Sequence, residues 1–326
     1  MPPTPLRIWC NRSFPPAAAQ LLRDALSPHQ LFTAQTLHQT NLAVGQPDPL
    51  LPTADIAFGQ LDPATVLNLP RIKWLHLPTA GYERFDRPNV LADLKNRGII
   101  LTTSSAVYAE PCAEHLLAMM LALARQLPLS ALNQLTARAW PAAATRAASH
   151  LLLRKTALLL GFGSIARRLV QLLSPFHMNL IAVRRSPADD DPIPTHPLSH
   201  LDTLLPLADH IINLLPGGLS TAKLFSPPRF ALMKPSAIFY NIGRGSTVDH
   251  DTLLTALRSR KIAAAFLDVT HPEPLPPDHP LWTTPNCFIT PHTAGGQCDE
   301  PLAIVQHFLD NLQRFTTNQP LHNRIV

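Results

Sequence analysis

Residues 158–166 read Leu158-Leu159-Leu160-Gly161-Phe162-Gly163-Ser164-Ile165-Ala166, an apolar run followed by two spaced glycines. The run predicts a buried strand, and the apolar spacing after it predicts a helix from Ser164 to about Leu173. Gly161 permits a tight turn, and Gly163 would let the backbone approach a pyrophosphate at the helix N-terminus. Ala166 stands where a third glycine is most common, and only close helix packing is required there. An isolated motif of this kind also fits an ordinary strand-to-helix turn, so its surroundings decide its meaning.

Those surroundings show strand-like runs alternating with helical patterns along the whole chain. The alternation predicts an α/β protein with parallel, doubly wound sheets. Before residue 105 the expected strands are Leu6–Cys10, Ala54–Phe58, Ile72–Leu77 and Ile99–Leu101. After it they are Thr156–Leu160, Asn179–Val183, Ile211–Leu215, Ala237–Tyr240, Ala263–Leu267 and Cys287–Thr290. Two long helices are expected, an almost wholly apolar one over Ala109–Ala124 and an amphipathic one over Pro301–Phe315.

Three residues of catalytic type each follow one of the later strand-like runs. They are Arg244 in Gly243-Arg244-Gly245, Glu273 between two prolines, and His292 in Thr290-Pro291-His292. Reduction of an oxo acid needs a cation for the carboxylate, a proton donor for the developing alkoxide, and a carboxylate that keeps that donor charged and oriented. Taken singly, these side chains also suit a solvated turn arginine, an exposed loop carboxylate and a surface histidine. The glycines beside Arg244 would suit a backbone close to bound ligands.

Together with the glycine motif, these loops resemble the D-isomer-specific 2-hydroxyacid dehydrogenase family. The resemblance is densest from Thr156 to Gly296. It implies that Arg244 anchors the substrate carboxylate, that His292 is the acid/base, and that Glu273 is the partner of His292. It also implies that the backbone of Ala80 and Gly81 contacts the substrate. The cofactor contacts it implies are Gly161, Phe162, Gly163, Ser164, Ile165, Arg184, Arg185, Ser186, Leu215, Pro216, Thr221, Ile242, Asp268 and His292.

The resemblance also predicts how the chain divides into domains. A Rossmann cofactor domain over residues 106–296 would be inserted into a smaller, flavodoxin-like substrate domain. The substrate domain would consist of residues 1–105 and 297–326, because the last helix returns to it. A homodimer is expected, with Trp140 as a packed interface residue; the alternative is that Trp140 contributes to the active site of the neighbouring subunit. We expect ligands outside the carboxyl ends of the strands, where all three catalytic loops fall.

The end of the strand at 179–183 bears on the choice of cofactor. NAD-selective sites place an acidic residue there to bind the ribose hydroxyls, whereas this chain has Arg184-Arg185-Ser186. Two guanidiniums and a hydroxyl would be donors for a 2′-phosphate, so NADPH is expected to be preferred, with NAD possible. The nearby Asp189-Asp190-Asp191 introduces an alternative, because these carboxylates would neutralise the arginines or supply the acid from a shifted loop.

Composition narrows the class of protein further. With 326 residues and 46% hydrophobic content the chain is long enough for two domains. The net charge is +5, but Lys and Arg are scattered, so neither nucleic-acid nor membrane binding is expected. Four dispersed cysteines fit a reducing compartment and no metal site is expected. No leader sequence and no apolar run of membrane-spanning length is recognised, which favours the cytoplasm.

The sequence therefore predicts an oxidoreductase that reduces a small 2-oxo acid, of the glyoxylate or hydroxypyruvate class, to a D-2-hydroxy acid with NAD(P)H. Two alternatives remain. One is a formate- or phosphite-type dehydrogenase on the same scaffold, against which Glu273 counts in the formate case. The other is a nucleotide-sensing binding protein like the corepressors that share this fold, which would bind cofactor with little turnover.

Overall fold

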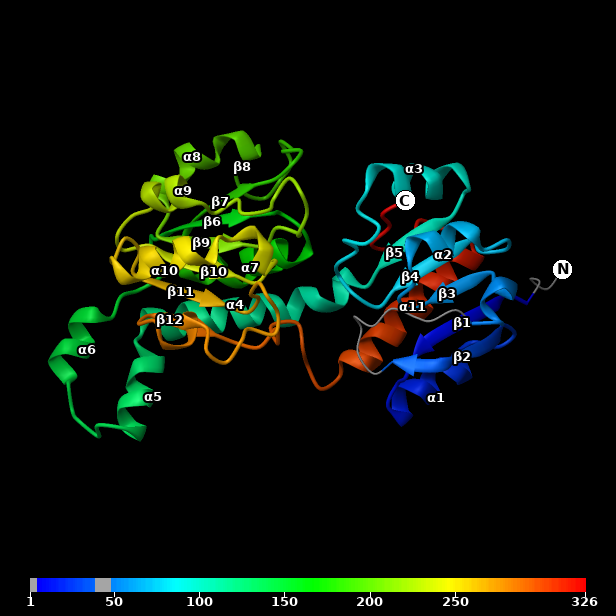
Figure 1. The fold of residues 1–326 in the computed structure, drawn as a ribbon, viewed down its shortest axis with the longest axis horizontal. Helices are drawn as coiled ribbons and strands as arrows, with labels where there is room; N and C mark the ends of the chain where they lie inside the picture. The colour runs from blue at the N-terminus through cyan, green and yellow to red at the C-terminus, as the bar shows by residue number, and fades with distance from the viewer. Residues whose placement is uncertain (1–4, 39–47) are drawn as a thin grey trace. The chain divides into compact units, whose positions relative to one another are not determined.

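The computed structural model describes residues 5–38 and 48–326. The chain forms two compact units: Met1–Tyr108 with Gly296–Val326, and Ala109–Gly295. It therefore leaves the first unit after Tyr108 and returns to it at Gly296. Both units are parallel sheets with helices on their faces, so the predicted α/β, doubly wound class is confirmed (Figure 1).

The first unit is built on a five-stranded sheet of order β2-β1-β3-β4-β5, the flavodoxin-like order. Its strands are β1 (Arg7–Arg12), β2 (Gln30–His38), β3 (Ile56–Phe58), β4 (Trp74–Leu77) and β5 (Ile100–Thr103). Its helices are α1 (Pro16–Ala25), α2 (Pro63–Asn68), α3 (Pro88–Asn96) and α11 (Glu300–Thr316). The sequence did not predict β2. That strand lies at the sheet edge and is mostly exposed, so it lacks the apolar pattern that marks a buried strand.

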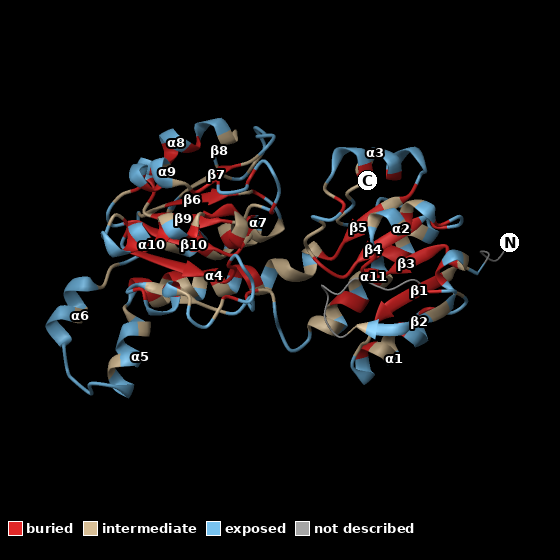
Figure 2. Cartoon of the chain, in the orientation of Figure 1, coloured by how far each residue is buried: buried red, intermediate tan, exposed pale blue. Residues whose placement is uncertain are grey.

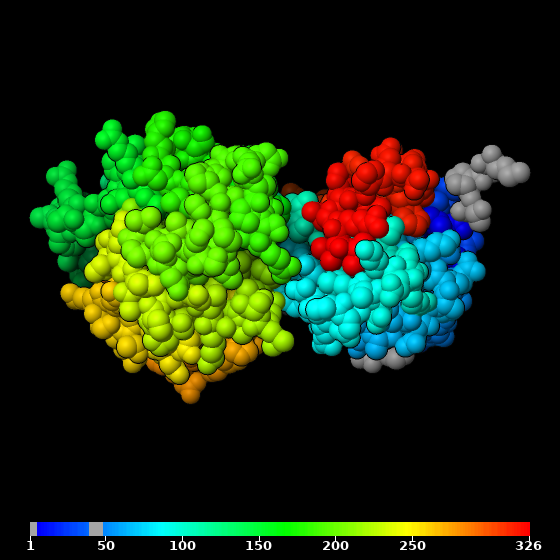
Figure 3. Space-filling view, turned by 90° about the horizontal axis from the view of Figure 1, so that it is seen from above, coloured from blue at the N-terminus to red at the C-terminus, as the bar shows by residue number. Residues whose placement is uncertain are grey.

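The C-terminal segment belongs to the core of the first unit. Phe308 of α11 stacks on Phe58 and Trp74, with ring centroids 4.2 and 5.3 Å apart. Beyond α11, Ile325 donates a backbone hydrogen bond to Leu101, and Thr103 donates one to Asn323. Figure 3 shows these red C-terminal residues against the cyan part of the same unit. The apolar periodicity after residue 300 thus predicted a helix that is needed to cover one face of the sheet.

The second unit is built on a seven-stranded sheet of order β12-β11-β10-β9-β6-β7-β8. Numbered within the unit this is 3-2-1-4-5-6 with a seventh strand added, which is the Rossmann order. Its strands are β6 (Thr156–Leu160), β7 (Asn179–Val183), β8 (Thr195–His196), β9 (His210–Asn213), β10 (Ile238–Asn241), β11 (Ala264–Leu267) and β12 (Cys287–Ile289). The order reverses between β6 and β9, where sheets of this kind bind ligands.

Helices cover the second sheet on both faces and also form an arm away from it. They are α4 (Ala109–Ala124), α5 (Leu127–Leu135), α6 (Ala142–Ala148), α7 (Ser164–Leu173), α8 (Leu201–Leu204), α9 (Pro227–Leu232) and α10 (His250–Arg258). In Figure 2 the central strands β6, β9, β10 and β11 are mostly red, whereas α5 and α6 are pale blue and tan. Neither of these two helices has a buried residue. No side chain of α5 or α6 is therefore part of the buried core of this unit.

Helix α4 and the 3-10 turn before it call for one correction. Ser105–Ala124 forms a 20-residue helix of mean hydropathy 1.2, which by length and composition alone suffices to cross a membrane. The expectation that no segment reaches that length is therefore wrong. Buried helices of globular proteins pass the same test, and α4 packs against α7 with Ala113, Leu116 and Met120 buried.

Candidate active site

The three predicted catalytic residues lie at one edge of the second sheet. Arg244, Glu273 and His292 follow β10, β11 and β12 respectively, and these three strands are neighbours. Because the strands are parallel, their carboxyl ends meet at the same edge. We call these three loops the catalytic edge.

Glu273 and His292 are brought into direct contact. The Nδ1 atom of His292 lies 3.0 Å from Oε1 of Glu273, with side chains 40% and 41% exposed. A carboxylate only accepts hydrogen bonds, so this contact places a proton on Nδ1 and orients the ring. The Nε2 atom is then the ring nitrogen that can exchange a proton with a substrate. This is the arrangement of an acid/base residue and the group that orients it.

Asp268 fixes the backbone of the loop that carries His292 through hydrogen bonds. Its buried carboxylate accepts hydrogen bonds from the backbone N–H groups of Thr293 and Ala294, at 2.8 and 3.0 Å, and from the Thr290 hydroxyl at 2.5 Å. Its carbonyl oxygen also accepts from the N–H of His292 at 2.9 Å. His292 itself has a φ of +52°, a left-handed conformation that this support maintains. Sequence reasoning gave Asp268 only a cofactor contact and missed this second set of bonds.

Arg244 lies in a loop whose carbonyl groups are held by buried polar side chains. The Arg244 carbonyl accepts hydrogen bonds from Asn241 Nδ2 at 3.1 Å and from the Thr247 hydroxyl at 2.6 Å. Asn213 on the neighbouring strand donates to both Asn241 and Thr247. The Arg244 side chain is half-buried, and its Nη1 donates to the Gly243 carbonyl at 2.7 Å. No sequence pattern marked Asn213 or Thr247 as part of this support.

The glycines beside Arg244 allow close packing of protein backbone. A Cβ on Gly243 would lie 2.5 Å from the Leu215 carbonyl oxygen, and one on Gly245 would collide with the Thr270 carbonyl. They therefore allow the arginine loop to pack against the loops that follow β9 and β11. Close packing of protein backbone is thus one reason for glycine at both positions, and the closeness of this backbone to a ligand stays a prediction.

The glycine turn after β6 fits a dinucleotide. Gly161 has a φ of +97° and its Cβ would press on Leu214, so the tight turn requires glycine. A Cβ on Gly163 would meet nothing within 4 Å among the described residues, so space is open ahead of α7. No side chain caps this ten-residue helix and its first turn carries no acid, so the N–H groups of Ile165 and Ala166 remain for a phosphate. Phe162 is buried beneath this turn.

The segment after β7 shows how the arginines and aspartates are paired. Arg184 donates from Nη1 to both carboxylate oxygens of Asp191, at 2.7 and 2.8 Å. Arg185 and Ser186 are exposed. Of the three aspartates in this loop, Asp191 is thus the one that contacts Arg184. The sequence-based alternative that these aspartates neutralise the arginines therefore corresponds to a contact present in the structure.

The remaining predicted cofactor residues lie after β9 and β10. Leu215 and Pro216 begin the loop after β9, and the Thr221 hydroxyl donates to the Pro216 carbonyl at 2.7 Å, which closes that loop. Ile242 is buried directly after β10. Among the described residues, no group of three or more His, Cys, Asp or Glu side chains is placed to hold a metal ion.

Ala80 and Gly81 lie in the first unit, in the loop after β4. That loop is held by hydrogen bonds to its neighbours. The Pro78 carbonyl accepts from the Tyr108 hydroxyl at 2.8 Å, and the Thr79 carbonyl accepts from the backbone N–H of Ser104. The Thr79 hydroxyl accepts from the Gln60 side-chain amide at 2.9 Å. The Thr79 hydroxyl donates to the Gly81 carbonyl at 2.7 Å. These bonds use the side chains and carbonyls of the loop rather than the N–H groups of Ala80 and Gly81.

Comparison with known proteins places this geometry in a family. Residues 117–294, more than half of the chain, match the family model described as D-isomer specific 2-hydroxyacid dehydrogenase, NAD binding domain. The chain is 30% identical over 310 residues to glyoxylate/hydroxypyruvate reductase B of Escherichia fergusonii, covering 92% of each chain. It also matches a solved D-isomer specific 2-hydroxyacid dehydrogenase family protein from Aeromonas salmonicida, with 31% identity, a TM-score of 0.75 and 99% of each chain covered.

A further solved structure shares the fold. It is the NADPH-dependent glyoxylate/hydroxypyruvate reductase of Sinorhizobium meliloti in complex with NADP and sulfate, with 21% identity, a TM-score of 0.77 and 98% of each chain covered. The predicted resemblance is confirmed by the family model and by the relatives with at least 30% identity. The chain belongs to the D-isomer specific 2-hydroxyacid dehydrogenase family and is an NAD(P)-dependent oxidoreductase.

Proposed function

We propose that this enzyme reduces a small 2-oxo acid of the glyoxylate or hydroxypyruvate class to the D-2-hydroxy acid. The observation that carries the proposal is the Glu273–His292 pair, 3.0 Å apart, beside the Arg244 loop at one sheet edge. The bound nicotinamide would supply hydride to the carbonyl carbon. The residues of the chain then have to bind the carboxylate, orient the carbonyl and deliver one proton.

Each catalytic side chain has one task in this proposal. Arg244 binds the substrate carboxylate with two N–H donors of its planar guanidinium and thereby orients the carbonyl. His292 donates a proton from Nε2 to the carbonyl oxygen as negative charge develops there. Glu273 stabilises the imidazolium and fixes its plane through Nδ1. The backbone N–H groups of Ala80 and Gly81 are proposed as further donors to the substrate carboxylate.

The substrate class is supported by relatives and by charge. The Escherichia fergusonii relative is named for glyoxylate and hydroxypyruvate, and it aligns over nearly the whole chain. The chain carries a net charge of +5, which attracts small anions. We assign both oxo acids as candidate substrates on this basis.

NADPH is proposed as the preferred cofactor, with NAD possible. Asp191, the acid that contacts Arg184, has a side chain only 2% exposed, so its carboxylate is not available to a ribose hydroxyl. Arg185 and Ser186 are exposed beside this pair as further donors. The Sinorhizobium meliloti neighbour, which shares the fold, was solved with NADP. The preference proposed is at least about tenfold in catalytic efficiency, or ~1.4 kcal/mol.

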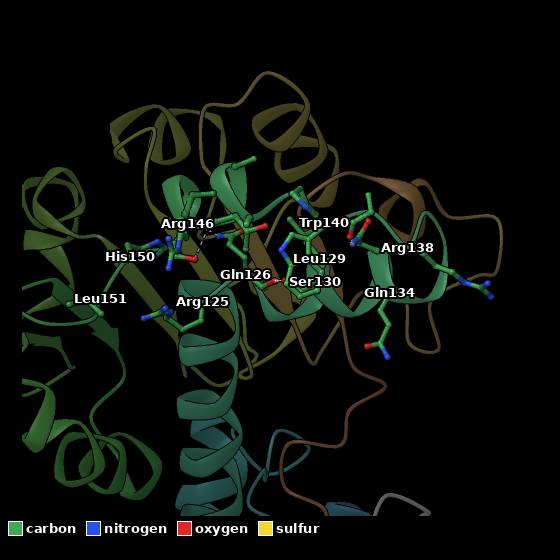
Figure 4. A pocket seen from close by; sticks show the side chains of 18 residues that line it. Arg125, Gln126, Leu129, Ser130, Gln134, Arg138, Trp140, Arg146, His150 and Leu151 are labelled. Atoms are coloured by element: carbon green, nitrogen blue, oxygen red, sulfur yellow. Dashed lines mark hydrogen bonds between the residues drawn. The ribbon is translucent and has the colours of Figure 1, made fainter.

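A homodimer through the α5–α6 arm is also proposed. The arm buries none of its residues, yet Leu135 is 79% exposed and Trp140 93% exposed. With Leu129 and Arg125, Trp140 lines a pocket of ≈ 1120 Å³ (Figure 4). Exposed apolar side chains on an arm outside the core support the proposal that a second copy covers them. Leu132→Glu with Leu135→Glu is expected to yield a monomer in light scattering, and an unchanged mass would contradict this interface.

The cytoplasm remains the proposed location. All four cysteines are free thiols, two buried, one half-buried and one exposed, which suits a reducing compartment.

The test of the proposed reaction is a panel of 2-oxo acids assayed with NADPH and with NADH. Glyoxylate or hydroxypyruvate is expected to give the highest catalytic efficiency, and formate and phosphite are expected to give none in the oxidative direction. Nucleotide binding without turnover of any oxo acid would contradict an enzymatic role. Turnover restricted to formate or phosphite would contradict the substrate class.

A further inference from the structure

Asp191 joins two cationic side chains from separate elements of the second unit. Arg184, at the end of β7, contributes two hydrogen bonds from Nη1, and Arg167, in α7, contributes one from Nη2 at 2.8 Å. The Thr195 hydroxyl adds a fourth at 3.0 Å. The Asp191 side chain is only 2% exposed, so these contacts enclose it. The four hydrogen bonds thus use the acceptor sites of the Asp191 carboxylate within the protein.

The two arginines keep free donors and remain open to solvent. Their side chains are 46% exposed for Arg167 and 28% for Arg184. Asp191 occupies one Nη of each, so the rest of each planar fork can still reach a ligand. Arg167 also lies over the Phe162 ring, 4.6 Å from its centroid. Arg167 therefore contacts both the glycine turn, through Phe162, and the loop after β7, through Asp191.

The ion-pair cluster itself favours an anion. Arg167, Arg184 and the enclosed Asp191 together carry one net positive charge. The adjoining Arg185 adds one positive charge and the exposed Asp189 and Asp190 add two negative charges, so these six side chains sum to zero. Burial alone would raise the pKa of Asp191, but hydrogen bonds from Arg184, Thr195 and Arg167 outweigh it and hold the pKa below its usual value. The carboxylate thus stays ionised at neutral pH and keeps its hold on both guanidiniums.

We propose that Arg167 is a second ligand, with Arg184, for the 2′-phosphate of NADPH, and that Asp191 is the positioning residue that holds both guanidiniums at one point. The inference rests on the proposed cofactor preference and extends it to two residues outside the Arg184-Arg185-Ser186 segment. A phosphate monoester dianion has three acceptor oxygens, so it can take donors from two forks at once. Holding two cations together in advance removes their mutual repulsion and part of their entropy cost on binding.

The test for Arg167 is a pair of variants on the same helix. Arg167→Met and Arg168→Met remove the same charge from adjacent positions, but Arg168 instead pairs with Glu110. Calorimetry with adenosine 2′,5′-bisphosphate and with AMP reports the 2′-phosphate contribution without any turnover. Arg167→Met should weaken the bisphosphate by roughly tenfold or more and leave AMP nearly unchanged, whereas Arg168→Met should alter neither. Equal effects of the two variants would overturn the role of Arg167.

The test for Asp191 separates positioning from net charge. Asp191→Asn and the matched control Asp190→Asn, in an exposed neighbour, both remove one negative charge. If charge alone mattered, both would tighten the binding of adenosine 2′,5′-bisphosphate. Positioning predicts instead that Asp191→Asn weakens it several-fold, and that Asp190→Asn leaves it unchanged or slightly tighter. Tighter binding by Asp191→Asn would overturn the proposal.

The failure of this inference can be told apart from the failure of the proposed cofactor preference. If the unmodified enzyme binds AMP as tightly as the bisphosphate, the preference for NADPH itself is wrong. If it prefers the bisphosphate but Arg167→Met retains that preference, only the role of Arg167 is wrong. Thermal unfolding of each variant checks that the loop after β7 has kept its fold, and a second variant, Arg167→Lys, should recover part of the affinity by restoring the charge.

Discussion

The catalytic edge and the loop after β7 prepare their functional side chains in opposite ways. At the catalytic edge the support acts on the backbone: buried Asp268 accepts from the two N–H groups that follow His292, and buried Asn241 donates to the carbonyl of Arg244. The imidazole and its carboxylate partner stay about 40% exposed. After β7 the support acts on the side chains themselves, because Asp191 binds both guanidiniums directly.

This difference matches the two proposed tasks, proton transfer at the catalytic edge and phosphate recognition after β7. Proton transfer requires atoms placed to within a fraction of an ångström, which a fixed backbone provides. Recognition of a phosphate requires a concentration of charge, which an ion-pair cluster provides. Substitutions at the catalytic edge should therefore change turnover at constant nucleotide affinity, and substitutions after β7 should change affinity at nearly constant turnover.

The largest effect is expected for His292. Replacing His292 with Gln removes the proton donor, so turnover of the oxo acid should fall by roughly 10² to 10⁴. NADPH affinity, measured by fluorescence titration, should change little, because the backbone of the loop is held by Asp268. A large loss of affinity would break the comparison, since the expected cofactor contact of His292 would then supply much of the nucleotide affinity.

Asp268→Asn changes the hydrogen bonds that hold the loop of His292 and leaves the imidazole itself chemically unchanged. The amide cannot accept all three hydrogen bonds, and its NH₂ group would face the N–H of Thr293 or Ala294. Displacement of His292 should then lower turnover by up to ~10²-fold. Unfolding in urea should show a loss of about 1–3 kcal/mol for a buried unsatisfied group. Wild-type turnover together with reduced stability would contradict the role of Asp268 in positioning the histidine.

An intermediate effect is expected after β7. Arg184→Gln with Arg185→Ala removes two of the proposed phosphate donors, so the proposed preference for NADPH, roughly tenfold or more, should disappear. The turnover number with saturating NADH should stay near that of the unmodified enzyme. The ratio of catalytic efficiencies for the two cofactors measures this, and an unchanged ratio would place the 2′-phosphate elsewhere.

The smallest effect concerns the helix that follows the arginine loop. Asp249 caps α10, and hydrogen bonds from Thr252 and Lys223 lower its pKa to about 2 from 3.8. A depressed pKa means that this stabilisation is present above pH ~4 and lost as the pH falls toward 2. Asp249→Ala should cost about 1 kcal/mol at neutral pH and flatten the stability curve between pH 4 and 2. Parallel curves for the two proteins would show that the cap contributes nothing.

The sequence predicted the parts of the fold that carry strong apolar periodicity. Helices α4 and α7 begin and end where their patterns do, and the buried strands of the second sheet were found within two residues. The exposed edge strand β2 and the two-residue β8 were not predicted, because neither has a buried face long enough to leave a pattern.

At the candidate site, sequence motifs named the side chains but not their supports. The pairing of Glu273 with His292 followed from the motif and the residue types. The contacts of Asp191 with Arg167, and of Asn213 with Thr247, join residues 24 and 34 positions apart, so no local pattern announces them. Such contacts depend on how strands are ordered in the sheet, which only the fold reveals.

The proposed reaction is tested most directly by following the hydrogen that is transferred. Hydroxypyruvate is reduced with NADPH that carries deuterium at the reactive position, and the product is examined by mass spectrometry and chiral chromatography. D-glycerate with one deuterium at C2 is expected from the unmodified enzyme, and almost none from His292→Gln. L-glycerate, a product without deuterium, or equal yields from the two proteins would contradict the proposed reaction.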